Sequence, residues 1–171
     1  MINNFIKLKS TYQDLNLLKQ VVLDETLEWD HSMDICVKFV ARELIKNKSM
    51  LTLMDKFNTN PVILKFISKS SYRWHKDINR DAALNVVIQS SNSHTVFGTK
   101  GPTGPNYSDI YAMNYIDLDE LIYEPTNIYL LNTSNMHSVL NLGDDRIIFS
   151  LGFPKPTTYI EVRDFCIENN L

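Results

Sequence analysis

The fold is decided by two β-rich segments, AALNVVIQ at residues 82–89 and RIIFSLGF at residues 146–153. Side chains alternate between the two faces of an extended strand, so each segment has one wholly apolar face. These apolar faces hold Ala82, Leu84, Val86 and Ile88 in the first segment, and Ile147, Phe149, Leu151 and Phe153 in the second. They are suited to packing under helices. The opposite faces carry single polar groups among small apolar ones, and they border either solvent or a ligand cavity.

Six similar runs are each bounded by Asn, Asp, Ser, Gly or Pro, which is typical of short strands. They span residues 62–68, 71–75, 94–98, 114–118, 121–124 and 127–133. Strands in series without intervening helices favour a β-sandwich or a jelly roll. We therefore expect a single domain over residues 1–171, with a β core that occupies residues 61–156.

The first 60 residues are predicted to form a helical N-terminal extension, because apolar residues recur there at helical spacing. Asp14 is a candidate N-cap for a first helix, and Ser32 or Asp34 for a second helix that continues to Leu44. A third, short helix is expected over residues 48–57.

The C-terminal residues 157–171 are expected to form a helix that opens with a capping box of Thr158 and Glu161. Together with the N-terminal helices, it would flank the β core. The expected fold class is therefore mainly β with flanking helices, an α+β arrangement.

The composition argues against several classes of protein. Of 171 residues, 44% are hydrophobic, so the chain can bury a sizeable core without disulfides. Lys and Arg number 17 against 20 Asp and Glu, and the net charge of −3 argues against a nucleic-acid partner bound through its phosphates. No apolar run approaches the ~20 residues of a membrane span, so we expect no membrane partner. Cys36 and Cys166 lack metal or redox spacing and are typical of core residues in a reducing compartment, here the cytoplasm.

Two histidines of the β region belong to a possible metal-binding pattern. His75 and Asp77 are two residues apart, which places both side chains on one side of an extended strand. A lone His-x-Asp is frequent by chance, and a solvated strand end is its simpler interpretation. His137 strengthens the metal hypothesis, because two imidazoles and a carboxylate suit a divalent transition metal.

Arg146 begins the last β-rich segment, nine residues after His137. The sequence LGDD at residues 142–145 is a turn signal, and a hairpin that turned there would set His137 almost opposite Arg146. Parity directs Arg146 to the mixed face of its strand, where a planar carboxylate would satisfy the guanidinium in a bidentate pair. A surface ion pair with Asp144 or Asp145 is the alternative.

The order His75-x-Asp77, His137 and Arg146 resembles the signature of the Fe(II)- and 2-oxoglutarate-dependent oxygenases. The resemblance covers residues 72–153, most of the β region. The local sequences WHKD at 74–77, ALN at 83–85 and HSV at 137–139 are similar to those of small bacterial and phage-type members, and through these to aspartyl/asparaginyl and prolyl hydroxylases. The resemblance implies a double-stranded β-helix, which is a cupin-like jelly roll, with flanking helices.

The resemblance also implies roles for individual residues. His75, Asp77 and His137 would be the catalytic metal ligands, forming a 2-His-1-carboxylate facial triad on Fe(II). Arg146 would bind the distal carboxylate of 2-oxoglutarate. The chain departs from the family at residue 148, which is Ile where many members carry Ser or Thr. A second carboxylate partner must then come from elsewhere, and the candidates are Asn85, Tyr129 and Ser150.

The implied reaction is hydroxylation of a C–H bond with O₂, coupled to the conversion of 2-oxoglutarate into succinate and CO₂. The implied substrate is a small molecule or a peptide side chain. Two alternatives stay open. One is a non-catalytic, cupin-type domain that binds a metal or small ligand and does not need Arg146 as an anion clamp. The other is a hydrolase-like zinc site on the same three ligands, which lacks an evident general base. The sequence indicates neither the exact substrate nor the oligomeric state.

Three further features of the sequence are less decisive: two have both a functional and a structural interpretation, and the third is expected to be structural only. Arg80, three residues after Asp77, either orients that carboxylate or faces water in a turn. Residues 98–106 hold three of the five glycines and form either a lid over the site or a plain surface loop. His94 is expected to be structural and to lie outside the metal triad.

Overall fold

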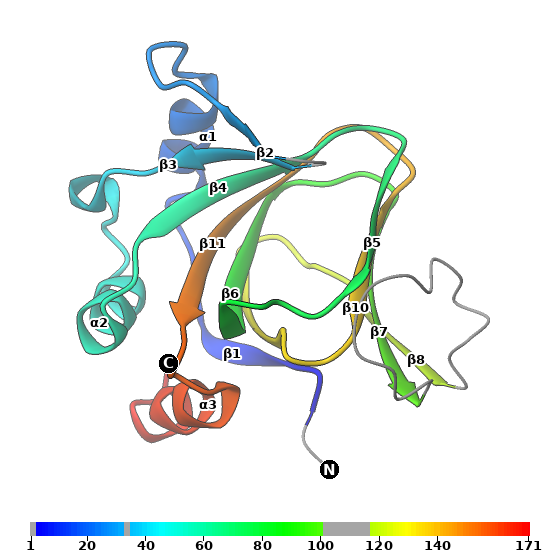
Figure 1. The fold of residues 1–171 in the computed structure, drawn as a ribbon. Helices are drawn as coiled ribbons and strands as arrows, with labels where there is room; N and C mark the ends of the chain where they lie inside the picture. Colours follow the sequence, from blue (N-terminus) through cyan, green and yellow to red (C-terminus); the bar gives the residue numbers. More distant parts are fainter. Residues whose placement is uncertain (1–2, 33–34, 101–116) are drawn as a thin grey trace.

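Most of the described chain is antiparallel β-structure in two sheets (Figure 1). The computed structural model describes residues 3–32, 35–100 and 117–171. The larger sheet has the spatial order β1 (Phe5–Thr11), β9 (Asn127–Asn132), β6 (Arg80–Gln89), β11 (Arg146–Pro154), β4 (Pro61–Phe66), β3 (Ile35–Phe39) and β2 (Asp30–Ser32). The smaller sheet has the order β5 (Ser70–His75), β10 (His137–Asn141), β7 (Ser93–Lys100) and β8 (Asp117–Leu121).

From β4 to β11 the chain passes repeatedly from one sheet to the other. Strands β4, β6, β9 and β11 belong to the larger sheet, whereas β5, β7, β8 and β10 belong to the smaller one. This alternation is that of a jelly roll, and the predicted mainly β fold with flanking helices is confirmed. One face of each central strand points into the space between the sheets (Figure 1).

Three α-helices pack on the outer face of the larger sheet (Figure 1). They are α1 (Leu15–Leu23), α2 (Lys48–Phe57) and α3 (Tyr159–Glu168). Helix α2 has the predicted bounds, and its N-cap side chain, Asn47, accepts a hydrogen bond from the Met50 amide. Helix α3 begins with the predicted capping box, in which the Thr158 hydroxyl and the Glu161 carboxylate each accept a bond from the other residue's backbone amide.

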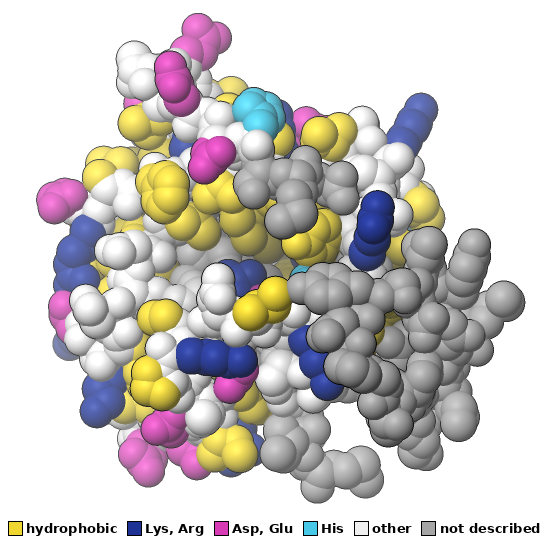
Figure 2. All heavy atoms as spheres, in the orientation of Figure 1, with side chains coloured by type: hydrophobic (Ala, Val, Ile, Leu, Met, Phe, Trp, Pro, Cys, Tyr) yellow, Lys and Arg dark blue, Asp and Glu magenta, His cyan; other side chains and the backbone are white. Residues whose placement is uncertain are grey.

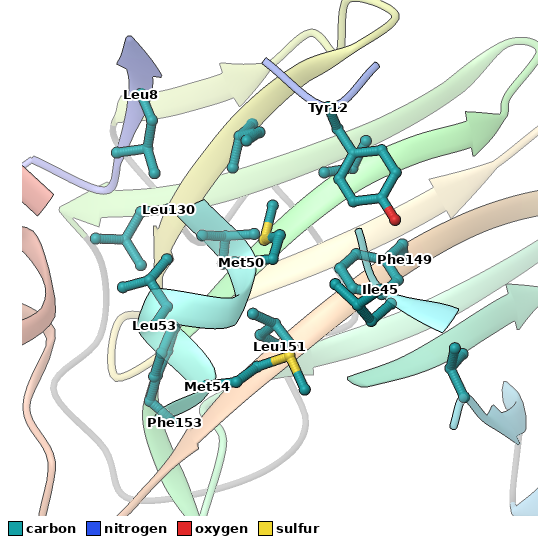
Figure 3. Close-up of a cluster of buried hydrophobic side chains, with 14 of the residues drawn as sticks. Leu8, Tyr12, Ile45, Met50, Leu53, Met54, Leu130, Phe149, Leu151 and Phe153 are labelled. Atoms are coloured by element: carbon teal, nitrogen blue, oxygen red, sulfur yellow. The ribbon is translucent and has the colours of Figure 1, made fainter. Parts of the chain in front are cut away.

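The apolar faces of β6 and β11 form the main core with these helices. In Figure 3, Leu151 and Phe153 of β11 lie beside Leu53 and Met54 of α2, and Phe149 lies beside Ile45. Every one of these side chains is at most 2% exposed. Burying side chains of this size from water is the dominant stabilising contribution, at about 1.5–3 kcal/mol each. The opposite faces of the same strands point into the space between the sheets, so the parity prediction holds for both strands.

The predicted second helix over residues 32–44 is wrong. Strands β2 and β3 occupy residues 30–32 and 35–39, and a single 3₁₀ turn follows at Arg42–Leu44. Strand β3 pairs with β4 from Ile35↔Phe66 to Phe39↔Val62, and these cross-strand bonds outweigh the weak local helical pattern. Residues 33 and 34 lie outside the described residues. The expected helical extension also contains β1, an edge strand paired with β9.

Two expectations about the strands change as well. Of the predicted run at 114–118, residues 114–116 lie outside the described residues, and β8 covers residues 117–121, so residues 122–124 follow a strand instead of forming one. The hairpin between His137 and Arg146 is wrong, because β10 pairs with β5 and β7, whereas β11 pairs with β4 and β6. The turn at residues 142–145 carries the chain from the smaller sheet to the larger one.

No helix of the described chain is long and apolar enough to cross a membrane.

Asn141, at the end of β10, fixes this crossover. Its side chain is fully buried, and Nδ2 lies 3.1, 2.8 and 3.0 Å from the backbone carbonyl oxygens of Phe66, Ile67 and Asp144. One amide group therefore ties the end of β4 to the turn before β11, and it positions the first residue of β11, Arg146.

Replacing Asn141 with Asp should destabilise the fold, because the carboxylate cannot donate to these carbonyl groups. We expect Asn141→Asp to lower the free energy of unfolding by about 1–3 kcal/mol in a urea titration. The matched control is Asn169→Asp, an exposed residue whose Nδ2 donates to one carbonyl, that of Phe165. That change should cost less than about 1 kcal/mol. Equal effects of the two substitutions would contradict the role assigned to Asn141.

Candidate metal centre

The three predicted metal ligands lie together at one end of the space between the sheets. His75 ends β5 and His137 begins β10, and the two residues are direct partners in the antiparallel ladder. Asp77 follows β5 by two residues, and its backbone amide donates to the Thr133 carbonyl at 3.0 Å. One ligand atom from each of the three side chains lies within 4.8 Å of the other two. Strand pairing thus joins residues that are 62 positions apart.

Each of the two imidazole rings is oriented by a backbone carbonyl group. His75 Nδ1 lies 2.6 Å from the Arg73 carbonyl oxygen, and His137 Nδ1 lies 2.9 Å from that of Asn135. A carbonyl oxygen can only accept, so each Nδ1 carries the proton and each Nε2 keeps its lone pair. Nε2 is then the atom available to a metal, and the carbonyl contact fixes the ring that presents it.

Arg80 contacts the third ligand. Its Nε donates to Asp77 Oδ2 at 2.5 Å, while Asp77 Oδ1 lies 3.4 Å from His75 Nε2. Of the two interpretations of Arg80, the structure therefore supports the one in which it orients the carboxylate. Gly152 makes room for it, since a Cβ at that position would lie 2.7 Å from Arg80 Nη1.

Burial and charge act on these ligands in different ways. Burial raises the pKa of Asp77, but the neighbouring His75 side chain and the charge of Arg80 outweigh it, so the net pKa lies well below its usual range. For His137, burial lowers the pKa to about 4, with His75 acting in the same direction. The pair is therefore an ionised carboxylate beside a neutral imidazole at neutral pH, which is the protonation state that a metal requires.

A cavity of about 80 Å³ leads from this centre into the space between the sheets. The walls are largely apolar, with Ile35, Leu64, Leu131, Val139 and Ile148 among the lining residues. The polar lining residues include the three metal-ligand candidates, Arg80, Asn85, Thr95, Tyr123 and Arg146. A water needs roughly 10–15 Å³ of such space, so the cavity has room for a small ligand of several heavy atoms and not for a large substrate.

Arg146 lines the same cavity and is only 1% exposed. Its guanidinium lies 5.3 Å from the Phe66 ring centroid and 4.8 Å from that of Tyr123, and Nη1 lies 3.3 Å from Ser93 Oγ. Within the described ranges no carboxylate forms an ion pair with it, and Nε has no hydrogen-bond partner. Burial lowers the pKa of Arg146, and the neighbouring Tyr123 opposes this effect.

The alternative pairing of Arg146 with surface carboxylates is not seen in the structure. Asp145 instead lies 3.7 Å from Lys65 Nζ and accepts from the Ser68 amide, and Asp144 accepts from the Ser91 hydroxyl. Both carboxylates face the surface while the guanidinium is buried. A cation buried in this way needs an anion or several acceptors to offset its lost hydration.

Of the three candidates for a second carboxylate partner, only Asn85 lines the cavity. Asn85 lines the cavity and donates through Nδ2 to the Tyr123 hydroxyl at 3.1 Å. Tyr129 is absent from the cavity lining, and its hydroxyl contacts Glu124. Ser150 is fully buried and is also absent from that lining. His94 pairs with Glu120, away from the triad, and most of the glycine-rich segment at 98–106 lies outside the described residues.

The sequence did not indicate several polar groups of the cavity, among them Thr95 and Tyr123. Thr95 lies on the predicted strand at 94–98, and parity along that strand would have placed it on one face with Phe97. Nothing in the spacing indicates which face is inner. Tyr123 lies just after β8, in the run at 121–124 that was expected to be a strand, and that expectation does not indicate that its side chain reaches a cavity.

The metal-free protein should lose stability in acid because of His137. A group whose pKa falls from 6.5 to about 4 on folding binds its proton more readily in the unfolded chain. Unfolding is therefore favoured progressively as the pH drops from about 6.5 to about 4, by up to about 3 kcal/mol. Denaturant titrations with a chelator present, at several pH values, should give a shallower pH dependence for His137→Gln than for the wild type. Identical slopes would contradict the assignment. Asp77 acts only below this window, since its pKa starts from 3.8 in the unfolded chain.

Gly152→Ala should disturb the metal centre from a distance. The new methyl group would displace Arg80, whose terminal nitrogen is the flexible end of a long side chain, so we expect little loss of fold stability. The affinity for Ni²⁺, measured by calorimetry, should fall by roughly tenfold, as happens when the partner of a ligand is lost. Arg80→Gln should have a similar effect, and the double variant should lose no more than either single one. Additive losses would show that Gly152 acts by another route.

The sequence matches no protein-family model and no curated protein. Solved structures do match. HygX from Streptomyces hygroscopicus, with nickel, 2-oxoglutarate and hygromycin B bound, has a TM-score of 0.63 at 11% identity, over 91% of this chain and 85% of that one. A prolyl hydroxylase from Trichoplax adhaerens, in complex with a peptide fragment of hypoxia-inducible factor, has a TM-score of 0.63 at 12% identity, over 95% and 87%. A prolyl-4-hydroxylase from Pseudomonas putida has a TM-score of 0.58 at 10% identity, over 90% and 94%.

Over nearly its whole length, therefore, this chain has the jelly-roll fold of the 2-oxoglutarate- and iron(II)-dependent oxygenases.

Proposed function

We propose that the protein is an Fe(II)- and 2-oxoglutarate-dependent dioxygenase that hydroxylates a C–H bond of a small molecule or a peptide side chain. The observation that carries this proposal is the presence, in one cavity, of a His75–Asp77–His137 group and a buried guanidinium without a carboxylate partner among the described residues. A ligand that satisfies both ends must bind a metal at one end and carry an anion at the other. 2-Oxoglutarate has both features.

The donor set fits iron. Two imidazole nitrogens and one carboxylate oxygen are the ligands of the facial triad, and these three side chains line the cavity that the ligand would occupy. When bound, Fe(II) and 2-oxoglutarate would supply the oxidation of a C–H bond by O₂, with release of succinate and CO₂. A zinc hydrolase would use the same ligands, but that function does not explain the buried guanidinium of Arg146.

The chain's own residues would orient the metal ligands, bind 2-oxoglutarate and exclude water from the cavity. The Arg73 and Asn135 carbonyl groups keep both Nε2 atoms aimed at the metal, and Arg80 keeps Asp77 in place. Arg146 would hold the distal carboxylate of 2-oxoglutarate at the inner end of the cavity, where low exposure strengthens the ion pair. The apolar side chains between the two ends would keep bulk water away from the metal.

A groove on the same molecule offers a place for the substrate. It is lined in part by Phe39, Asn58, Asn60 and Asn79, and it shares the lining residue Arg80 with the metal cavity. In Figure 2 the face toward the viewer is hollowed near its centre, and hydrophobic side chains gather along the edge of the hollow. Structures of similar fold hold hygromycin B or a peptide fragment, which supports a small molecule or a peptide as the substrate.

The proposal differs from its main alternative, a non-catalytic cupin-type domain, in what it requires of Arg146. A domain that only bound a metal would have no use for a cation held 1% exposed at the far end of the cavity. The retention of this costly group supports the oxygenase.

The test is an anaerobic titration of the protein and Fe(II) with 2-oxoglutarate, followed by the visible charge-transfer absorption of the complex. We expect the band in the wild type and its loss in His75→Ala. Arg146→Met should keep the metal affinity but require roughly a hundredfold more 2-oxoglutarate, because an ion pair within the cavity is lost.

The matched control is Lys38→Met. Lys38 is equally buried, but its Nζ donates to the carbonyl groups of Val21, Val22 and Asp24 beyond the cavity. Its loss should leave the 2-oxoglutarate titration unchanged. A wild type without the band, or an Arg146→Met variant that titrates like the wild type, would contradict the proposed function.

A further inference from the structure

Strand β7 runs beside the cavity, and its residue Thr95 lines it. Ser93, Thr95 and Phe97 share one face of the strand. At one end Ser93 Oγ lies 3.3 Å from Arg146 Nη1, and at the other the Phe97 ring lies 5.5 Å from that of the metal-ligand candidate His137. Thr95 therefore lies between the guanidinium and the metal centre, on the wall that connects them.

The Thr95 hydroxyl has no partner of its own. The side chain is 1% exposed, it lines the cavity, and Oγ1 has no hydrogen-bond partner among residues 3–32, 35–100 and 117–171. A buried hydroxyl without a partner destabilises a fold, so such groups are rare and call for an explanation. A cavity ligand with acceptor oxygens would supply the missing bond.

Tyr123 brings a second hydroxyl to the same region. Its ring packs on the guanidinium of Arg146 at 4.8 Å, and its oxygen accepts a bond from Asn85 Nδ2 at 3.1 Å. Because that oxygen already accepts, its proton is free to be donated to another group. The packing of Tyr123 against Tyr129, with ring centroids 5.3 Å apart, holds the ring in this position.

We propose that the hydroxyl groups of Thr95 and Tyr123, together with Arg146, form the cradle for the distal carboxylate of the cavity ligand. This inference rests on the proposed function, in which that ligand is 2-oxoglutarate. A carboxylate offers about four lone-pair positions, and the guanidinium can fill two of them in a planar pair. The two hydroxyl groups would fill the others.

Neighbouring residues offer no equivalent donor. Ile148 lines the cavity two residues along β11 from Arg146, on the same face of the strand, but it is apolar. Ser150 is absent from the cavity lining, and Tyr129 directs its hydroxyl to Glu124. Two other hydroxyl-bearing residues line the cavity, but Thr133 Oγ1 donates to the Arg80 carbonyl oxygen at 3.4 Å and the Tyr72 ring packs on that of His75 at the metal end, with centroids 4.4 Å apart. Tyr123 instead packs on Arg146, and Thr95 lies between Arg146 and the metal centre, so these two are the hydroxyl donors assigned to the distal end.

The experiment removes each hydroxyl while keeping the shape of the side chain. We expect Thr95→Val and Tyr123→Phe to bind Fe(II) like the wild type and to require roughly tenfold to a hundredfold more 2-oxoglutarate in the anaerobic absorption titration, as for a bond to a charged group. Thr95→Val should fold at least as stably as the wild type in thermal unfolding, because it removes an unpaired buried hydroxyl. A loss of affinity thus cannot be ascribed to unfolding.

A second ligand tells where the hydroxyl groups act. 2-Oxopentanoate has the same length and the same keto acid end as 2-oxoglutarate but lacks the distal carboxylate. If the hydroxyl groups bind that carboxylate, Thr95→Val and Tyr123→Phe should lower the affinity for 2-oxoglutarate and leave the affinity for 2-oxopentanoate nearly unchanged. Equal losses for the two ligands would overturn the assignment to the distal end.

Two controls and one rescue complete the test. Thr95→Ser keeps the hydroxyl and should bind 2-oxoglutarate nearly as well as the wild type. Tyr129→Phe removes a hydroxyl outside the cavity and should have no effect on the titration. Ile148→Thr, added to Thr95→Val, places a new hydroxyl on the same cavity wall as Arg146 and should recover a large part of the lost affinity.

The outcomes for the cradle and for the proposed function can be told apart. A wild type that binds 2-oxoglutarate through Arg146, with Thr95→Val and Tyr123→Phe binding it equally well, overturns the cradle and leaves the function standing. A wild type that binds metal but no 2-oxoglutarate overturns both. Selective loss of 2-oxoglutarate affinity in the two variants, with normal metal binding, supports both.

Discussion

The buried guanidinium of Arg146 is the constraint around which the inner half of this molecule is arranged. A cation that is 1% exposed has lost most of its hydration, and no carboxylate of the described residues pairs with the guanidinium to compensate for that loss. The rings of Phe66 and Tyr123 and the hydroxyl of Ser93 offset a part of that cost. The rest must be borne by the stability of the surrounding fold, or by a ligand that brings the missing negative charge.

The larger sheet can offset this cost because one of its faces packs in the apolar core and the other borders the cavity. Phe149 and Leu151 point to the outer face, where they pack fully buried under the helices, whereas Arg146 and Ile148 of the same strand point to the cavity. The period-two alternation of the strand is what separates them. A shift of β11 by one residue would move Arg146 into the apolar core, so the core that stabilises the fold also fixes the register of the candidate site.

The predictable part of the structure follows from this alternation, and the unpredictable part from tertiary pairing. The faces of residues 82–89 and 146–153 and the His75-x-Asp77 spacing could be inferred locally, since each depends on neighbours in sequence. The path of the chain after Asn141 could not be inferred locally, because a turn at residues 142–145 is compatible both with a hairpin and with a passage from one sheet to the other. Residues 35–39 form a strand because they pair with the edge of β4, and Tyr123 lines the cavity from a segment whose strand-like pattern does not predict that position.

The groups that make the cavity costly without a ligand include three that the sequence indicated, Asn85, His137 and Arg146, and one that it did not, Thr95. The side-chain oxygens of Asn85 and Thr95 and the Nε atom of Arg146 are buried around one small space without partners among the described residues, while His137 is held neutral by burial. A ligand that fills this space binds only the folded chain and therefore stabilises it. The same unpaired groups lower the stability of the empty protein and raise the affinity for a ligand that pairs them, because their desolvation is already complete before the ligand arrives. A cavity built in this way selects for a small anion at its inner end more strongly than an exposed arginine would, and the apolar residues around it act only by keeping water out.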